Sequence, residues 1–173
     1  MKRYVLGFIV LLTVLCGGCN NQGRIHDNYN SITHHKTMYK PLNVQESFFS
    51  CDGTLSIIRA HSERISFEYE RADTPAKRAR GLMYRAHMKD TQSMLFIFDS
   101  ERPRFFYMKN TYIPLDILFL DKEKKIVKMH QYAKPLSCDV LPSECAACYA
   151  LELCAGSCER NHIMLGDIVL WNT

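Results

Sequence analysis

Short apolar runs, separated by charged or turn-forming residues, are the feature that most constrains the fold of this 173-residue chain. Residues 65–69 alternate apolar and polar side chains, which is typical of a strand with one buried face. Residues 94–98 are apolar throughout, as expected of a strand covered on both faces. Further strand-like runs lie at residues 105–108, 115–120, 126–132, 148–153 and 168–171. This spacing predicts a mostly-β, single compact β-sandwich or barrel-like domain.

One or two short helices and several turns complete the expected domain. Thr74 and Pro75 suit the N-cap and the first position of a helix of one to three turns. Gly81 is expected where that helix ends or where the backbone passes closely, because glycine accepts positive φ without strain. A second helical turn is predicted over residues 155–161. Charged residues predict turns at residues 100–104 and at 121–124, the latter an exposed hairpin turn.

The N-terminus has the pattern of an exported bacterial protein. Lys2 and Arg3 precede an apolar run over residues 4–15, which is too short to span a bilayer as a helix. Small residues before Cys19 match the lipobox of bacterial lipoproteins, although Cys16 stands where leucine is usual. We therefore expect a signal peptide over residues 1–18 and lipidation at Cys19. Without lipidation, the same segment would be an ordinary cleaved signal or an uncleaved anchor.

A lipid on Cys19 would anchor the protein to a membrane of the cell envelope. Asn20 is not the aspartate associated with inner-membrane retention, so the periplasmic face of the outer membrane is expected in a Gram-negative host. Residues 19–50 are predicted to be the lipidated cysteine and a flexible linker, since they are polar and show no period. The folded domain is expected over residues 51–173.

The charge of the chain does not favour nucleic acid as a partner. Removal of residues 1–18 takes away Lys2 and Arg3, so the formal charge falls from +4 to +2. Nucleic-acid binders usually carry a clear basic surface. The expected partners are therefore the membrane, through the lipid, and an unknown small ligand or envelope protein.

Six ordered sequence blocks resemble the DUF192 (UPF0127) family. The blocks are residues 80–85 (RGLMYR), 94–98 (MLFIF), 108–117 (MKNTYIPLDI), 133–135 (AKP), 149–152 (YALE) and 166–167 (GD). The resemblance spans more than half of the chain that remains after residue 18. It implies a compact β-rich sandwich or barrel-like domain, often behind a signal or lipobox. It implies no reaction.

Two of these blocks suggest a small polar ligand site made of Arg85, Lys109, Asn110, Thr111 and Asp116. The two cations could bind an anion, and the amide and hydroxyl could orient a ligand beside apolar walls. The alternative is structural: asparagine and threonine are common turn residues. In that alternative the arginine pairs with the aspartate and holds the helix against the sheet.

Six cysteines follow the lipidation site: Cys51, Cys138, Cys145, Cys148, Cys154 and Cys158. An even number in an exported chain is compatible with disulfides, and the first two could form a further pair. The last four lie in two close pairs that could instead bind Zn²⁺. Packing as small apolar side chains is a third alternative. The CxxC spacing at residues 145–148 lacks a following helix, so redox catalysis is not expected.

The remaining residues show no catalytic constellation. The chain lacks a GxSxG nucleophile turn, an HExxH zinc motif and a phosphate-binding GxxxxGK loop. We expect a non-catalytic envelope module that binds a small molecule, a glycan or a partner protein, without a cofactor. The alternative is a zinc protein built on the cysteine cluster, or an enzyme of unknown reaction.

Overall fold

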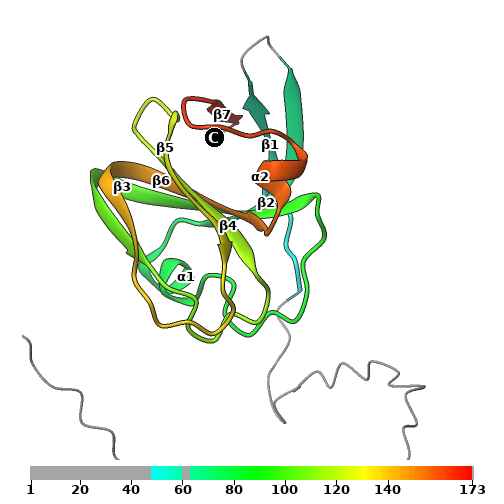
Figure 1. Cartoon of the computed structure of the whole chain (residues 1–173), viewed down its shortest axis with the longest axis vertical. Coiled ribbons are helices and arrows are strands. Elements are labelled where there is room, and N and C mark those ends of the chain that lie inside the picture. Colours follow the sequence, from blue (N-terminus) through cyan, green and yellow to red (C-terminus); the bar gives the residue numbers. More distant parts are fainter. Residues whose placement is uncertain (1–47, 60–62, 173) are drawn as a thin grey trace, which may run out of the picture. The chain divides into compact units, whose positions relative to one another are not determined.

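The computed structural model describes residues 48–59 and 63–172, which form one curled sheet of seven strands (Figure 1). The strand order is β5-β4-β6-β3-β2-β1-β7. The strands are β1 (Gly53–Ile58), β2 (Arg64–Ala72), β3 (Gln92–Phe106), β4 (Leu115–Leu120), β5 (Ile126–Ala133), β6 (Leu141–Cys154) and β7 (Ile168–Trp171). Neighbouring strands are antiparallel except β2 and β3, which are parallel. A parallel pair needs a crossover connection, and here that connection carries α1 (Pro75–Arg80).

The sheet curls until its two edge strands meet at one end. Lys125, just before β5, forms an isolated antiparallel bridge with Ile168 in β7. Two backbone hydrogen bonds of 2.9 Å reinforce this contact, from Val169 N to Lys124 O and from Ile126 N to Asp167 O. The predicted mostly-β, barrel-like fold is therefore confirmed, as a half-barrel with one closed corner.

Both faces of the central strands are buried, because two hydrophobic clusters lie on opposite sides of them. Alternate residues such as Leu95, Leu118 and Leu151 enter the cluster that also contains Trp171. The intervening residues, such as Phe96 and Phe119, enter a second cluster. The continuous apolar run at residues 94–98 is thus a doubly covered strand, as its sequence predicts.

The predicted turn at residues 100–104 is wrong, because β3 continues through this charged segment. The pairing register with β6 shifts between Ile97 and Arg102, so the strand bends without ending. Arg104 is buried, donates from Nε to Ala147 O at 3.1 Å and stacks 3.9 Å from the centre of the Phe98 ring. A charged residue thereby becomes part of the interior. The sequence also gave no prediction of β1 or of the first half of β6.

The first helix has the predicted N-cap, and the second lies where a helical turn was predicted. Thr74 accepts a hydrogen bond from Lys77 N at 3.2 Å, and α1 ends at Gly81 with φ +48°. A Cβ at Gly81 would lie 3.3 Å from Phe96 Cζ, so glycine is needed for both conformation and space. The second helix, α2 (Ser157–Arg160), lies within the predicted helical turn.

The signal peptide, Cys19 and all but the end of the linker lie outside the described residues. Within residues 48–59 and 63–172, no helix has both the length and the apolar character needed to cross a membrane.

Candidate functional site

A row of side chains with two glutamates crosses four adjacent strands on the side of the second hydrophobic cluster. Met94 in β3 pairs with Glu70 in β2 and with Glu152 in β6, and Glu152 pairs with Ile117 in β4. Side chains at paired positions project from the same face of a sheet. Both carboxyl groups are therefore held on the covered face, one on each side of Met94, and both residues are less than one tenth exposed.

Arg85 forms a buried ion pair with Glu70. Its Nη2 lies 2.6 Å from Glu70 Oε2, and both side chains are less than one tenth exposed. The other Glu70 oxygen accepts a hydrogen bond from Ser50 N at 2.6 Å. A buried carboxylate needs such compensation, because removal from water strongly disfavours its charge.

The loop that carries Arg85 is fixed by Asn110. Tyr84, with φ +65°, precedes Arg85 and donates its backbone N–H to Asn110 O at 2.7 Å. Asn110 Nδ2 in turn donates to the Tyr84 hydroxyl at 2.8 Å. Two of the sequence blocks that carry the family resemblance therefore contact each other, and their contact positions the arginine over the sheet.

Glu152 lacks comparable compensation. Burial raises the pKa of its carboxyl from the ordinary 4.5 to about 8, and the nearby Arg85 only partly opposes the shift. Its Oε2 is buried and has no hydrogen-bond partner among the described residues. At neutral pH the group is therefore mainly a carboxylic acid, which can donate a hydrogen bond as well as accept one.

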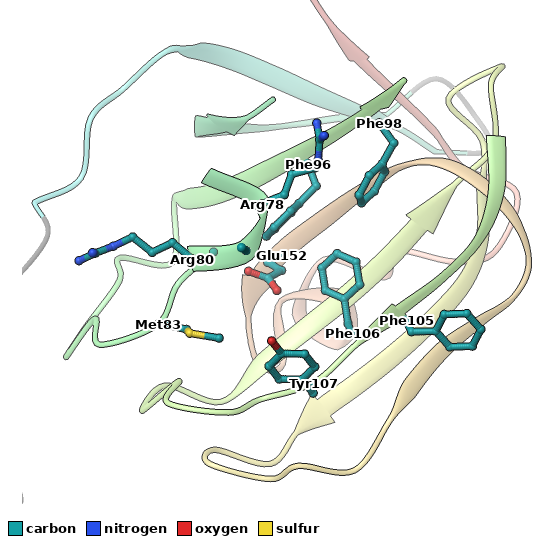
Figure 2. A pocket seen from close by; sticks show the side chains of 11 residues that line it. Arg78, Arg80, Met83, Phe96, Phe98, Phe105, Phe106, Tyr107 and Glu152 are labelled. Atoms are coloured by element: carbon teal, nitrogen blue, oxygen red, sulfur yellow. The ribbon is translucent and has the colours of Figure 1, made fainter. Parts of the chain in front are cut away.

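Glu152 is one of the residues that line a partly aromatic cavity of about 280 Å³, which we call the Glu152 pocket (Figure 2). The pocket is lined by Arg78, Ala79, Arg80, Gly81, Met83, Phe96, Phe98, Phe105, Phe106, Tyr107 and Glu152. Figure 2 shows the carboxyl among the side chains of Met83, Phe106 and Tyr107, whereas Arg80 extends away from it. The walls come from α1 and the turn after it, from β3 and from β6.

The aromatic wall of the pocket is well supported. Phe106 makes edge contacts with Phe96 and Phe98, at centroid distances of 5.0 and 6.4 Å. Arg78 and Arg104 both lie over the Phe98 ring, 5.6 and 3.9 Å from its centre. Such contacts hold the rings in place before any ligand enters.

The residues of the polar site predicted from the sequence make separate contacts. Arg85 pairs with Glu70, and Asn110 holds Tyr84. Lys109 is exposed, and buried Thr111 donates from Oγ1 to Lys109 O at 3.4 Å. The hydroxyl and the amide thus have the local turn contacts of the structural alternative.

The structural alternative paired Asp116 with Arg85, but the structure gives each of them other partners. Asp116 is completely buried, and its two oxygens accept from Tyr132 N and Cys158 N, each at 2.9 Å. The carboxylate therefore ties the end of β5 to α2, whereas the arginine takes its acidic partner from β2. The sequence did not indicate Glu70 as the partner, because it could not place the turn after α1 beside β2.

The six cysteines are free thiols in the part of the chain that the structure describes. Cys145 and Cys148 lie three residues apart in β6, so their Cα atoms are about 10 Å apart, beyond the reach of a disulfide. Cys154 donates to Met88 O at 3.4 Å, and Cys158 is buried in the first hydrophobic cluster. Over residues 48–59 and 63–172, no cluster of three or more potential metal ligands forms. Among the described residues, the four cysteines of the alternative zinc site are therefore not brought together.

Alkylation of the folded protein is expected to distinguish these thiols. Exposed Cys51 and Cys138 should react with iodoacetamide first. Burial raises the pKa of Cys154 to about 11 and that of Cys158 further, so these two should react slowly or only after unfolding. Peptide mass spectrometry without prior reduction measures the order. Absence of labelling at Cys51 and Cys138 until a reductant is added would instead show that they form a disulfide.

The sequence contained a signal for Glu152 that the prediction did not use. Glu152 interrupts the strand-like run of residues 148–153. In a strand covered on both faces, an acidic residue must lie in the interior, so this position indicates a buried carboxyl. Glu70 carries no such signal, because the alternation of residues 65–69 places it on the same face as Ser66 and Glu68.

The fold and the pocket define a small mostly-β domain with an aromatic cavity between α1 and its sheet. Residues 56–171 match the family DUF192, described as "Uncharacterized ACR, COG1430", and the chain belongs to this family. No curated protein matches the chain.

Two solved structures share the fold. One is a Sinorhizobium meliloti 1021 protein provisionally described as a transcription regulator, with 35% identity and a TM-score of 0.68; the match covers 72% of this chain and 97% of that one. The other is a protein of unknown function from Novosphingobium aromaticivorans DSM 12444, with 31% identity and a TM-score of 0.66. That match covers 68% of this chain and 84% of the other.

Proposed function

We propose that this protein is a binding module that holds a small, largely apolar molecule in the Glu152 pocket. The observation that carries the proposal is a buried carboxyl, without a hydrogen-bond partner at one oxygen, among the lining residues of a pocket with aromatic walls. Small-molecule sites commonly combine apolar walls with a few placed polar groups. A volume of about 280 Å³ suits a ligand of one ring with a short substituent.

Energetics support a binding role over a purely structural one. A buried polar atom without a partner costs about 1–3 kcal/mol, and a ligand that hydrogen-bonds Glu152 would recover part of that cost. The neighbouring Glu70 shows what a structural glutamate looks like here: Ser50 N donates to one of its oxygens, and the Arg85 guanidinium forms an ion pair with the other. Glu152 differs from Glu70 because its Oε2 has neither a hydrogen bond nor an ion pair among the described residues, and because it lines a cavity.

We further propose that the module works in the cell envelope, attached to a membrane through lipid on Cys19. The support is the N-terminal sequence, with two cations, a short apolar run and a lipobox-like end. We do not extend the description of the Sinorhizobium protein to this chain. With residues 1–18 removed the formal charge is only +2, whereas nucleic-acid binding depends on concentrated positive charge.

Filling the pocket from α1 tests the binding proposal. Ala79 and Ala76 are both exposed on this helix, but only Ala79 lines the Glu152 pocket. We expect the purified protein to bind 3-phenylpropan-1-ol, seen as NMR shifts of the pocket phenylalanines. Ala79→Trp should weaken this binding by at least about tenfold, because the indole takes the ligand's space. Ala76→Trp should leave it unchanged.

The melting temperature of each variant shows that the fold is retained. Equal binding by the wild type and Ala79→Trp would place the ligand elsewhere and contradict the proposal. Absence of any pocket shift in the wild-type protein at saturating alcohol would contradict it too.

A further inference from the structure

The charged lining residues of the Glu152 pocket, apart from Glu152 itself, are both arginines. Arg78 and Arg80 line it from α1, and Glu152 is the single carboxyl among its lining residues. Asp99 lies 3.7 Å from Arg78 but is largely exposed, so water weakens its effect. Burial keeps the proton on Glu152, as its raised pKa of about 8 indicates. The lining is thus cationic, with an acidic hydrogen-bond donor inside.

We propose that the ligand of this pocket is a small aromatic or aliphatic carboxylate, whose oxygen accepts a hydrogen bond from the Glu152 carboxylic acid. The apolar body of the ligand lies against Phe96, Phe106 and Met83. Arg78 and Arg80 favour its negative charge from the mouth. This inference rests on the proposed binding function and adds the chemical class of the ligand.

The groups that face Glu152 from the surrounding elements are consistent with this assignment. The turn after α1 contributes Arg85, whose charge is countered by Glu70 from β2. The α1 helix contributes Arg78, and the segment after β3 contributes the hydroxyl of Tyr107, whereas the Arg80 side chain extends away from the carboxyl (Figure 2). The partner of Glu152 on β4 is Ile117, which carries no charge. The carboxyl thus meets more positive than negative charge.

A cationic ligand fits the same residues less well. It would have to drive the proton off Glu152, and it would enter past two arginines. A carboxylate needs neither change. Short hydrogen bonds between a carboxylic acid and a carboxylate are also stronger than those between neutral groups.

Three probes with the same phenylpropyl body compare the ligand classes: 3-phenylpropionate, 3-phenylpropan-1-ol and 3-phenylpropylamine. They carry a negative charge, no charge and a positive charge at neutral pH. We expect the carboxylate to bind the full purified protein at least about tenfold more tightly than the alcohol at pH 7, measured by calorimetry. The amine should bind most weakly.

The pH dependence identifies Glu152 as the group responsible. Binding of the carboxylate should weaken about tenfold between roughly pH 7 and pH 9, because ionised Glu152 repels it. Glu152→Gln keeps a donor that does not titrate, so its affinity for the carboxylate should not change between pH 7 and pH 9. Glu68→Gln changes an exposed glutamate and should behave like the wild type.

Each outcome has a defined meaning. Equal affinity for the alcohol and the carboxylate would overturn the carboxylate inference but leave the binding function intact. Tighter binding of the amine, or a pH dependence that persists in Glu152→Gln, would also overturn it. If no probe binds the pocket, both the inference and the binding function fail.

Discussion

Replacement of Arg85 by alanine is expected to lower the free energy of unfolding by about 3–5 kcal/mol, the usual cost of breaking one side of a buried ion pair. The 2.6 Å contact with Glu70 is shielded from water on both sides. Without the guanidinium, Glu70 stays buried with less compensation. Glu152 also loses the cation that partly opposes the rise of its pKa. Arg85 therefore supports both carboxyl groups of the row.

Urea unfolding at neutral pH measures this effect, and Arg80→Ala is the matched control. Arg80 is exposed at the end of α1, so its loss should cost less than about 0.5 kcal/mol. A similar small loss for Arg85→Ala would show that Glu70 keeps its charge compensated by other groups. It would also contradict a central role for the ion pair.

The fold was predictable where local sequence and tertiary packing agree. Residues 115–120 and 168–171 coincide with β4 and β7, and Thr74 caps α1 as predicted. Alternating and continuous apolar runs indicate which side chains are buried, so these strands could be predicted without knowing which strands they pair with. The half-barrel itself was not predictable from these local patterns, because strand order depends on contacts between residues far apart in the sequence.

The errors arose where a charged residue lies in the interior. Arg104 looks like part of a turn in the sequence, yet it is buried against Phe98 within β3. Its long apolar stem and stacked guanidinium allow this. Composition alone cannot separate such an arginine from its exposed neighbours.

The sequence identified the polar residues of the candidate site but could not predict which of them contact one another. Arg85 and Asn110 do belong to one local structure, but through Tyr84 rather than through a shared ligand. Asp116 binds the backbone of two other elements. A turn residue and a ligand-binding residue have the same types of side chain, so only contacts distinguish them.

Replacement of Glu152 by glutamine is expected to stabilise the protein at pH 7 by up to about 3 kcal/mol, unusual for a change in a buried residue. The carboxyl has a pKa of 4.5 when unfolded and about 8 when folded. Between these values the folded state binds the proton more tightly, so the wild type loses stability as pH rises from about 4.5 to 8. The amide carries no charge and avoids this loss.

The pH profile of the difference separates this cause from better packing. Below about pH 4.5 the carboxyl is protonated in both states, so glutamate and glutamine should give nearly equal free energies of unfolding in urea. The advantage of glutamine should then grow with pH and level off above about pH 8. A constant advantage would indicate packing. A variant less stable than the wild type at pH 7 would mean that Glu152 is ionised and paired in the folded protein, and the acid donor required for carboxylate binding would not exist.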